Sequence, residues 1–440
     1  MNAQVANRYA YAFDHVKPAL PGAYLPWLNH AREEALTSFL DIGFPSLRDE
    51  DWKYTSVAPI EKAAFNLEQP AAGNAVDAAA IAALALHGAR LLAFVDGRYA
   101  PRLTRLGDLP AGVIVTSLAE TLVRDPERLR VPFGYPSDGY ASGFAALNLA
   151  FMHDGAYIHL AAGAALDEPL HLLFVSTCPN QATHIRNRVV AETGSHIRIV
   201  EHHAALGAAG YFNNVVTDIV ARRGATVEHY KLQEESLAAF HVAAVNAKVG
   251  QDARFVSAAL AFGGALARTD IDVTLNGEGA QCVLDGLYIG DGRQHLDHHT
   301  RIDHAQPRGT SREFYKGILD GAARAVFNGK VIVRPDAQQS DAQQTNHNLL
   351  LSEQAEIDTK PQLEIWADDV KCGHGATVGQ LDPDQIFYLR SRGIEDAAAR
   401  WLLVLAFAGE VVDHVGLPHL RQRLDALLHA RLPRGTGALR

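Results

Sequence analysis

The chain is poor in cysteine, in long apolar runs and in positive charge. Its three cysteines, Cys178, Cys282 and Cys372, lie far apart and form no CxxC pair, so we expect no disulfide framework and a cytoplasmic location. No run of 18 apolar residues occurs, and the first twenty residues lack a charged segment followed by an apolar one. We therefore expect neither a membrane span nor a secretory signal. The formal net charge of −10 argues against a general nucleic-acid binder, which needs a basic face.

Several catalytic signatures are also missing. The sequence contains no GxxxxGK[ST], no GxSxG and no HExxH. It therefore predicts no phosphate-binding loop for ATP hydrolysis, no nucleophile elbow and no zinc-protease helix. The hydrophobic share of 48% and the charged share of 20% are ordinary for a globular protein.

The central part of the chain has the character of a β protein. From about residue 155 to 379 it consists of short, β-branched, partly alternating runs with no convincing long helix. Turn pairs separate these runs, and the first four recur every 27 to 30 residues, a spacing typical of repeat architectures. The pairs are Gly194-Ser195, Gly224-Ala225, Asp252-Ala253, Gly279-Ala280 and Gly321-Ala322. A stacked β-solenoid explains this pattern. A β-sandwich remains the alternative, although it usually carries Asn-Gly or Asp-Gly hairpin turns.

Helical patterns flank this central part. Apolar residues at helical spacing predict a helix over residues 26–40, which Gly43 and Pro45 end. The short runs 91–95 and 113–115 could pair as a β-hairpin. Helices are expected over 384–392 and 394–414, and a third begins at Pro418, with an apolar stripe of Leu420, Leu424, Leu427 and Leu428. We thus divide the chain into an N-terminal, mostly helical region (1–135), a β core (140–382) and a C-terminal helical region (383–440).

Four segments carry a resemblance to a known family. HLDHHTRIDHAQPRGTSREFYKGILDGAARAVFNGKVIV (295–333) resembles the core signature of the SufB/SufD family, scaffold proteins that assemble iron–sulfur clusters. DTKPQLEIWADDVKCGHGATVGQLDPDQIFYLRSRGI (358–394) is similar to the D-type member of that pair. The stretches GFPSLRDEDWKYTS (43–56) and LLAFVDGRYAP (91–101) also resemble the D-type subunit. These motifs are long and specific, and together they span nearly the whole chain.

The resemblance implies a fold and a set of partners. The fold would be mainly β, a right-handed parallel β-helix flanked by helical terminal regions. The chain would be a non-enzymatic scaffold of the SUF machinery that pairs with a B-type homologue and docks an ABC-type ATPase on its C-terminal helices. The apolar stripes of those helices could instead pack only on the β-helix. Iron or a nascent iron–sulfur cluster would lie transiently at the interface with the B-type partner, and the complex could hold a reduced flavin. A homodimer is expected for the isolated chain.

Cys372 and His374 are the sharpest candidates for chemistry. Thiolate sulfur and imidazole nitrogen are both good ligands for iron. In an extended strand, residues i and i+2 point to the same side, so the two side chains would form a metal site only two ligands deep. The family resemblance implies that these positions work at the interface with the B-type partner. The alternative is that Cys372 is a small buried side chain and His374 a hydrogen-bonded edge residue.

A second polar cluster lies at the start of the core signature. His and carboxylate side chains are natural metal ligands, but the adjacent His298 and His299 would face opposite sides of a strand. We therefore interpret the cluster as polar residues that satisfy one another by hydrogen bonds within the stacked coils. Its members are His295, Asp297, His298, His299, Asp303 and His304.

Two further hypotheses concern single positions. His347 lies where the resemblance places a sulfur-accepting cysteine in the B-type partner; a histidine cannot carry a persulfide, although it could bind iron. The alternative function is a cytoplasmic β-solenoid hydrolase or lyase acting on polysaccharide, in which Asp297, Arg301 and Asp303 would line a groove. The expected terminal helices and the lack of a suitable carboxylate pair count against it.

Overall fold

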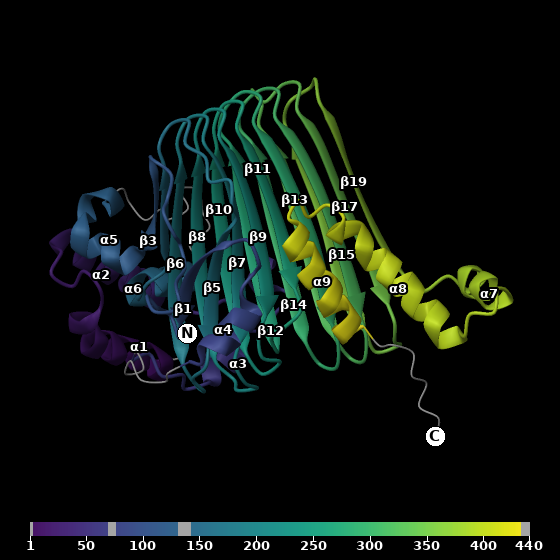
Figure 1. The fold of residues 1–440 in the computed structure, drawn as a ribbon, viewed down its shortest axis with the longest axis horizontal. Helices are drawn as coiled ribbons and strands as arrows, with labels where there is room; N and C mark the ends of the chain where they lie inside the picture. The colour runs from purple at the N-terminus through teal and green to yellow at the C-terminus, as the bar shows by residue number, and fades with distance from the viewer. Residues whose placement is uncertain (1–2, 69–75, 131–141, 433–440) are drawn as a thin grey trace.

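A parallel β-helix forms the centre of the molecule (Figure 1). The computed structural model describes residues 3–68, 76–130 and 142–432. Two sheets face each other, and from the fourth strand onward successive strands alternate between them and pair in parallel with the strand two places on. This pairing confirms the solenoid and contradicts the sandwich, whose sheets are antiparallel.

The first sheet has ten strands and the second has nine. In chain order, the first sheet contains β1 (Arg90–Val95), β2 (Arg98–Tyr99), β5 (Leu170–Ser176), β7 (His196–Ala205), β9 (Thr226–Glu234), β11 (Arg254–Ala261), β13 (Gln281–Gly290), β15 (Thr310–Leu319), β17 (Asp341–Leu350) and β19 (Lys371–Gly379). The second contains β3 (Val113–Ser117), β4 (Ala156–Leu160), β6 (Ala182–Ala191), β8 (Phe212–Ala221), β10 (Phe240–Val249), β12 (Leu266–Leu275), β14 (His295–His304), β16 (Arg324–Val333) and β18 (Glu356–Ile365). A continuous apolar core fills the space between the sheets.

The recurring turn pairs form one corner of the β-helix. Gly224 has φ +64° and Asp252 has φ +53°, a conformation that glycine adopts without strain and Asp tolerates. The N–H of Gly224 donates to the carbonyl of Gln251 one coil further on. The next residue in each turn, such as Ala225 or Ala253, is fully buried inside the corner, where only a small side chain fits. Four predicted pairs lie here, whereas the fifth turns from β15 to β16 at another corner.

Most helices of the N-terminal region cover the outer face of the second sheet, whereas the helix at residues 78–84 packs through Ile81 on Leu91 and Leu173 of the first sheet. Phe39, Trp52 and Phe144 belong to one apolar cluster with Phe212 and Val242 of the sheet. The elements of this region are α1 (Ala3–Val16), η1 (Lys17–Ala19), α2 (Pro26–Ile42), η2 (Glu50–Trp52), α3 (Ala58–Lys62), α4 (Ala78–Leu84), α5 (Leu118–Arg124), η3 (Pro126–Leu129) and α6 (Gly143–Phe151).

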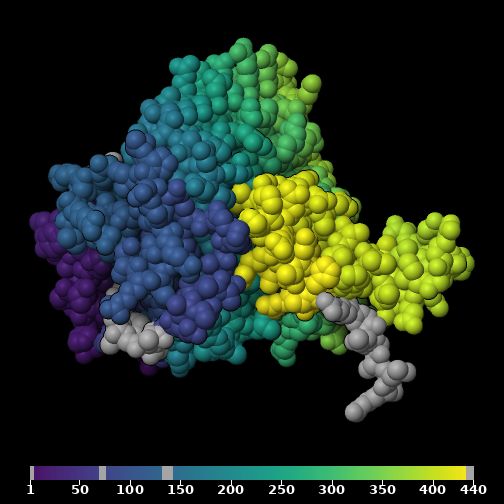
Figure 2. All heavy atoms as spheres, in the orientation of Figure 1, coloured from purple at the N-terminus to yellow at the C-terminus, as the bar shows by residue number. Residues whose placement is uncertain are grey.

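Three helices follow the last strand. They are α7 (Pro383–Ser391), α8 (Asp396–Val412) and α9 (Pro418–Arg431). Leu420, Leu424 and Leu428 of α9 are buried in a cluster with Val200 and Leu232 on the outer face of the first sheet. The first helix, α7, projects away from the β-helix (Figures 1 and 2). Within the described parts of the chain, no helix is both long and apolar enough to cross a membrane.

The predicted hairpin is wrong in its partner. Val113–Ser117 does not pair with Arg90–Val95; it runs antiparallel to β4 in the second sheet, while β1 turns through Asp96-Gly97 into β2 and pairs in parallel with β5. The two short runs instead belong to different sheets of the β-helix, β1 to the first and β3 to the second. Strands from the predicted helical region therefore extend the β core. The predicted boundary at residues 135–140 and the last eight residues lie outside the described residues.

Candidate metal half-site at the end of the β-helix

Cys372 and His374 lie on β19, the last strand of the first sheet. The register places Cys372 beside Ala342 and His374 beside Gln344 of β17. Ala342 and Gln344 are buried between the two sheets, and side chains in register on neighbouring parallel strands share a face. Both candidate ligands therefore share one face of the strand, as their spacing predicts, and this face is the interior side of the β-helix.

The two side chains differ in their surroundings. Cys372 is half-buried against Ala342 and Val331, and this burial raises the pKa of its thiol. A metal ion would have to displace the thiol proton to bind the sulfur. His374 is exposed, and its ring has no hydrogen bond or ion pair among the described residues. No group of three or more His, Cys, Asp or Glu side chains in the described parts of the chain could hold a metal ion, so this pair is at most half of a ligand set.

The end of the β-helix around this pair is open. Residues of β18 and β19 are half-exposed or exposed along their whole length, whereas strands further inside are mostly buried. Ile365, Trp366 and Val378 expose 41%, 65% and 49% of their surface. Each of these two strands has a neighbour on one side only, and an exposed strand edge is a template for pairing with another chain.

His347 lies apart from this pair. It is on β17, but at a position of the opposite parity from Gln344, and its Nδ1 is 2.6 Å from the Thr377 hydroxyl. Thr377 is likewise of opposite parity to Cys372 and His374 on β19. His347 thus faces the outside of the first sheet and is not brought together with the two candidate ligands.

The polar cluster at the start of the core signature, between His295 and His304, divides between the two faces of β14. On the outer face, Asp297 accepts a hydrogen bond from Thr55 (2.6 Å) and pairs with Arg268 (2.8 Å) and His299 (3.1 Å). These cationic and hydroxyl partners hold the pKa of Asp297 well below its usual range against the effect of burial. His295 Nε2 is 2.8 Å from the same Thr55 hydroxyl. These contacts favour the structural interpretation of the outward-facing members.

The inward-facing members have other roles. His298 stacks on the ring of Tyr288 at 5.0 Å, and burial lowers its pKa to about 4, so it is neutral. His304 Nε2 is 2.9 Å from the Ser311 hydroxyl. Both are part of the packed interior.

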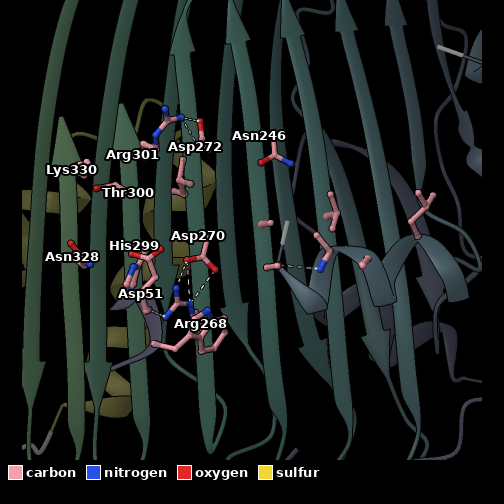
Figure 3. A pocket seen from close by; sticks show the side chains of 18 of the residues that line it. Asp51, Asn246, Arg268, Asp270, Asp272, His299, Thr300, Arg301, Asn328 and Lys330 are labelled. Atoms are coloured by element: carbon pink, nitrogen blue, oxygen red, sulfur yellow. Dashed lines mark hydrogen bonds and ion pairs between the residues drawn. The ribbon is translucent and has the colours of Figure 1, made fainter. Parts of the chain in front are cut away.

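A cleft separates the outer face of the second sheet from the N-terminal elements, and Figure 3 shows its ion pairs. Arg268 donates to Asp270 (2.7 Å) and to the carbonyl of Asp51 (2.7 Å), and Arg301 pairs with Asp272 (3.0 Å). The guanidinium of Arg268 lies 3.7 Å from the centre of the Trp52 ring. Arg268 thus joins the N-terminal motif to Asp297 of the core motif, and Thr55 contacts Asp297 directly; the sequence did not predict this contact between the two motifs.

Arg301 and Asp303, which the hydrolase alternative placed in a substrate groove, also form ion pairs. Arg301 pairs with Asp303 at 3.0 Å, and Arg334 pairs with the same carboxylate at 2.8 Å. With Asp297 bound to Arg268, these acidic side chains are part of a network of ion pairs on the outer face of the sheet.

The interior also contains a charged cluster that sequence reasoning missed. Glu201 accepts hydrogen bonds from Lys231 (3.0 Å), Thr217 (2.6 Å) and His203 (2.9 Å), and His229 lies 3.2 Å away. All five side chains are buried, and the pKa of Glu201 is lowered because these partners outweigh the effect of burial. The alternation of Ile197, Ile199 and Glu201 along β7 is the sequence signal that could have revealed an inward carboxylate.

The C-terminal helices divide into a buried and an exposed part. The predicted apolar stripe of α9 packs on the first sheet. This agrees with the alternative prediction that the stripes of the C-terminal helices pack on the β-helix and do not dock an ATPase. Phe387 and Tyr388 of α7, however, expose 73% and 58% of their surface, and Leu402 of α8 exposes 38%. These three exposed apolar side chains of α7 and α8 are here called the α7 patch.

Comparison with known proteins places the chain among cluster assembly components. The family described as SUF system FeS cluster assembly, SufBD core domain, matches residues 174–407, and the SufBD protein N-terminal region matches residues 3–172. A SufBD family iron–sulfur cluster assembly protein of Synechocystis is 35% identical over 92% of this chain and 91% of its own length. The iron–sulfur cluster assembly protein SufD of Escherichia coli is 33% identical over 92% of this chain and 93% of its own. SufD of Bacillus subtilis is 25% identical over 65% of the chain and 66% of its own.

Proposed function

Because the chain belongs to the SufBD family of SUF iron–sulfur cluster assembly proteins, we propose that it is the D-type scaffold subunit of a cytoplasmic assembly complex. It pairs with a B-type homologue through the open end of its β-helix, and Cys372 and His374 supply half of the ligands for iron or a nascent cluster at that contact. The observation that carries this proposal is the inward-facing Cys372–His374 pair on a strand that has no further neighbour.

The shape of the open end supports pairing with a related chain. A second β-helix could continue both sheets by pairing with the free edges of β18 and β19, and it would cover Ile365 and Val378. It would also close the metal site, because iron needs more ligands than two side chains provide. In the absence of the B-type subunit, two copies of this chain could meet by the same ends, which gives a symmetric homodimer.

The α7 patch is the proposed docking surface for an ABC-type ATPase. Its helices are tied to the β-helix close to the open end: Lys316 of β15 contacts Glu410 (2.7 Å) and the carbonyl of Phe407 (3.1 Å), and His414 contacts Asp285 (3.0 Å). A movement of the ATPase would therefore reach β15, which lies beside β17 in the sheet. In this proposal the chain itself catalyses no reaction; it transmits motion and holds ligands.

Co-purification tests the proposed partners. The tagged chain is expected to retain a B-type homologue and an ABC-type ATPase from an extract of its own cells. Tyr388→Ser should lose the ATPase and keep the B-type subunit. Tyr11→Ser changes a tyrosine that is 78% exposed on α1, at the end of the molecule opposite α7 (Figure 1), and should keep both. A chain that purifies alone from the extract would contradict the proposal.

Cluster formation tests the proposed ligands. Cys372→Ser and His374→Ala should each lower the yield of clusters on the assembled complex, measured by visible absorption after anaerobic reconstitution. His347→Ala is the matched control because it changes a histidine on the opposite face of the same sheet. Full yield in both ligand variants would refute the assignment.

A further inference from the structure

Gln344 lies beside His374 on the neighbouring strand of the first sheet. The two residues are partners in the parallel register of β17 and β19, where neighbouring strands lie about 4.8 Å apart. Gln344 is 1% exposed, so its amide is shut into the interior of the β-helix. Side chains of such a pair, on the same face of one sheet, are within contact distance of each other.

Among the described residues, the side-chain amide of Gln344 forms a hydrogen bond through its nitrogen but not through its oxygen. Its Nε2 donates to Glu313 Oε2 at 2.6 Å, a bond that an oxygen of either the ionised or the protonated carboxyl can accept. Glycine at position 329 leaves the room for it, because a Cβ there would lie 2.1 Å from Nε2. The sequence therefore provides both an anchor and a space for this one orientation.

The oxygen of the same amide is left without a partner. Gln344 Oε1 is buried and accepts no hydrogen bond among the described residues. A buried acceptor without a donor costs about 1–3 kcal/mol, and such groups are few in native proteins. In a planar amide the oxygen and the nitrogen point in different directions, and here the nitrogen meets Glu313 of β15. The neighbour of β17 on its other side is β19, and the ring of His374 has no partner among the described residues.

We propose that Gln344 is the positioning residue for His374: when metal binds, the imidazole turns inward and donates one ring N–H to Gln344 Oε1, which leaves the other ring nitrogen facing the open end as the ligand. The inference rests on the proposed function of Cys372 and His374. Metal-binding histidines in general donate their second ring N–H to an oxygen acceptor, which fixes the tautomer and the ring orientation. Glu313 acts one step further back by fixing which way the amide points.

Metal affinity of the complex between the full chain and its B-type partner tests this role, with Co²⁺ as the probe under anaerobic conditions. Gln344→Met removes the acceptor and keeps the length of the side chain, and it should weaken Co²⁺ binding about 10- to 100-fold. Gln343→Met is the matched control, because Gln343 is the exposed neighbour of opposite parity on the same strand, and it should leave the affinity unchanged.

A double-mutant cycle separates positioning from general damage to the fold. Gln344→Met should add no further loss in the His374→Ala background, but it should keep its effect in the Cys372→Ser background. Equal additional losses in both backgrounds, or unchanged affinity in Gln344→Met while His374→Ala weakens binding, would overturn the inference and leave the proposed function intact. If His374→Ala itself leaves Co²⁺ affinity unchanged, the proposed ligand and the inference both fall.

Discussion

The middle and the end of the β-helix use similar polar side chains for opposite purposes. In the middle, both carboxylate oxygens of Glu201 are occupied by surrounding donors, and the whole cluster is buried. At the end, the His374 ring and the Gln344 oxygen have no partner among the described residues. A buried carboxylate whose oxygens are both filled by donors helps to fix the structure around it, although His203 Nδ1 in the same cluster has no partner among the described residues. An unfilled buried acceptor that lies next to the open end is instead placed where a donor could still reach it.

The largest effect should come from breaking the Glu201 network. Lys231→Met leaves Glu201 buried without its ammonium partner. Removal of one member of a buried ion pair typically costs about 3–5 kcal/mol, and urea unfolding of the purified chain should show a loss of this order. Glu201→Gln combined with Lys231→Met removes both charges and should recover part of that loss. A loss below about 1 kcal/mol in the single variant would mean that the cluster contributes little to the fold.

The turns of the fold could be predicted from the sequence, but most of its polar strands could not. The pairs such as Gly224-Ala225 recur because every coil needs one residue with positive φ and one small buried side chain, and both needs are local. The inward residues of β14 and β17, for example His298 and Asn346, are polar, so the alternation that defines a half-buried strand does not show there which face is inside. Residues 113–115 pair with β4 and not with residues 91–95. A run of three residues does not contain enough information to predict which strand it pairs with.

The candidate site shows the same limit. Cys372 and His374 were identified by residue type, by their i, i+2 spacing and by the family resemblance, and the family is confirmed while their role as ligands stays a prediction. Gln344 and Glu313 were missed because their relation to His374 depends on the register of strands about 30 residues apart, and a register shift of one residue would turn them to the other face.

Glu313 offers a test of the end region that depends on pH. Burial raises the pKa of this carboxyl to about 7 from its ordinary value of 4.5, so the folded state resists its ionisation. Between these two values the unfolded chain releases the proton while the folded chain keeps it, and stability falls as pH rises through this window. At 1.36 kcal/mol per pKa unit, the loss is about 3 kcal/mol by neutral pH.

Glu313→Gln removes this titration. The free energy of unfolding of the variant minus that of the wild-type chain should therefore rise between pH 4.5 and 7.5 and then level off, measured by urea unfolding at a series of pH values. Glu353→Gln, at an exposed glutamate in the turn before β18, serves as the control and should give a flat difference. A flat difference for Glu313→Gln as well would show that this carboxyl is ionised without cost in the folded chain.

A smaller effect is expected where the N-terminal region meets the core signature. Thr55→Val removes the hydroxyl that contacts both Asp297 and His295 and should cost about 1–2 kcal/mol. Hydrogen exchange should rise in residues 50–57 with little change at β19. Thr37→Val, at a threonine whose hydroxyl bonds only to the preceding turn of α2, should change stability by less than about 0.5 kcal/mol. Equal losses in the two variants would mean that the contact with the core signature adds nothing.

The smallest effect should be found at the candidate ligand itself. Cys282 and Cys372 lie in one inward-facing row, separated by Ser311 and Ala342 in the registers of β13, β15, β17 and β19. Cys282 is 1% exposed, so Cys282→Ser places a hydroxyl in the closed core and should cost about 1–3 kcal/mol. Cys372→Ser changes the same atom at the open end, where water can reach it, and should alter stability by less than about 0.5 kcal/mol while it lowers cluster yield. Thermal midpoints of the two variants, measured side by side, check the comparison directly. If Cys372→Ser destabilised the chain as much as Cys282→Ser, its sulfur would be a core atom and its effect on cluster yield would no longer indicate a ligand.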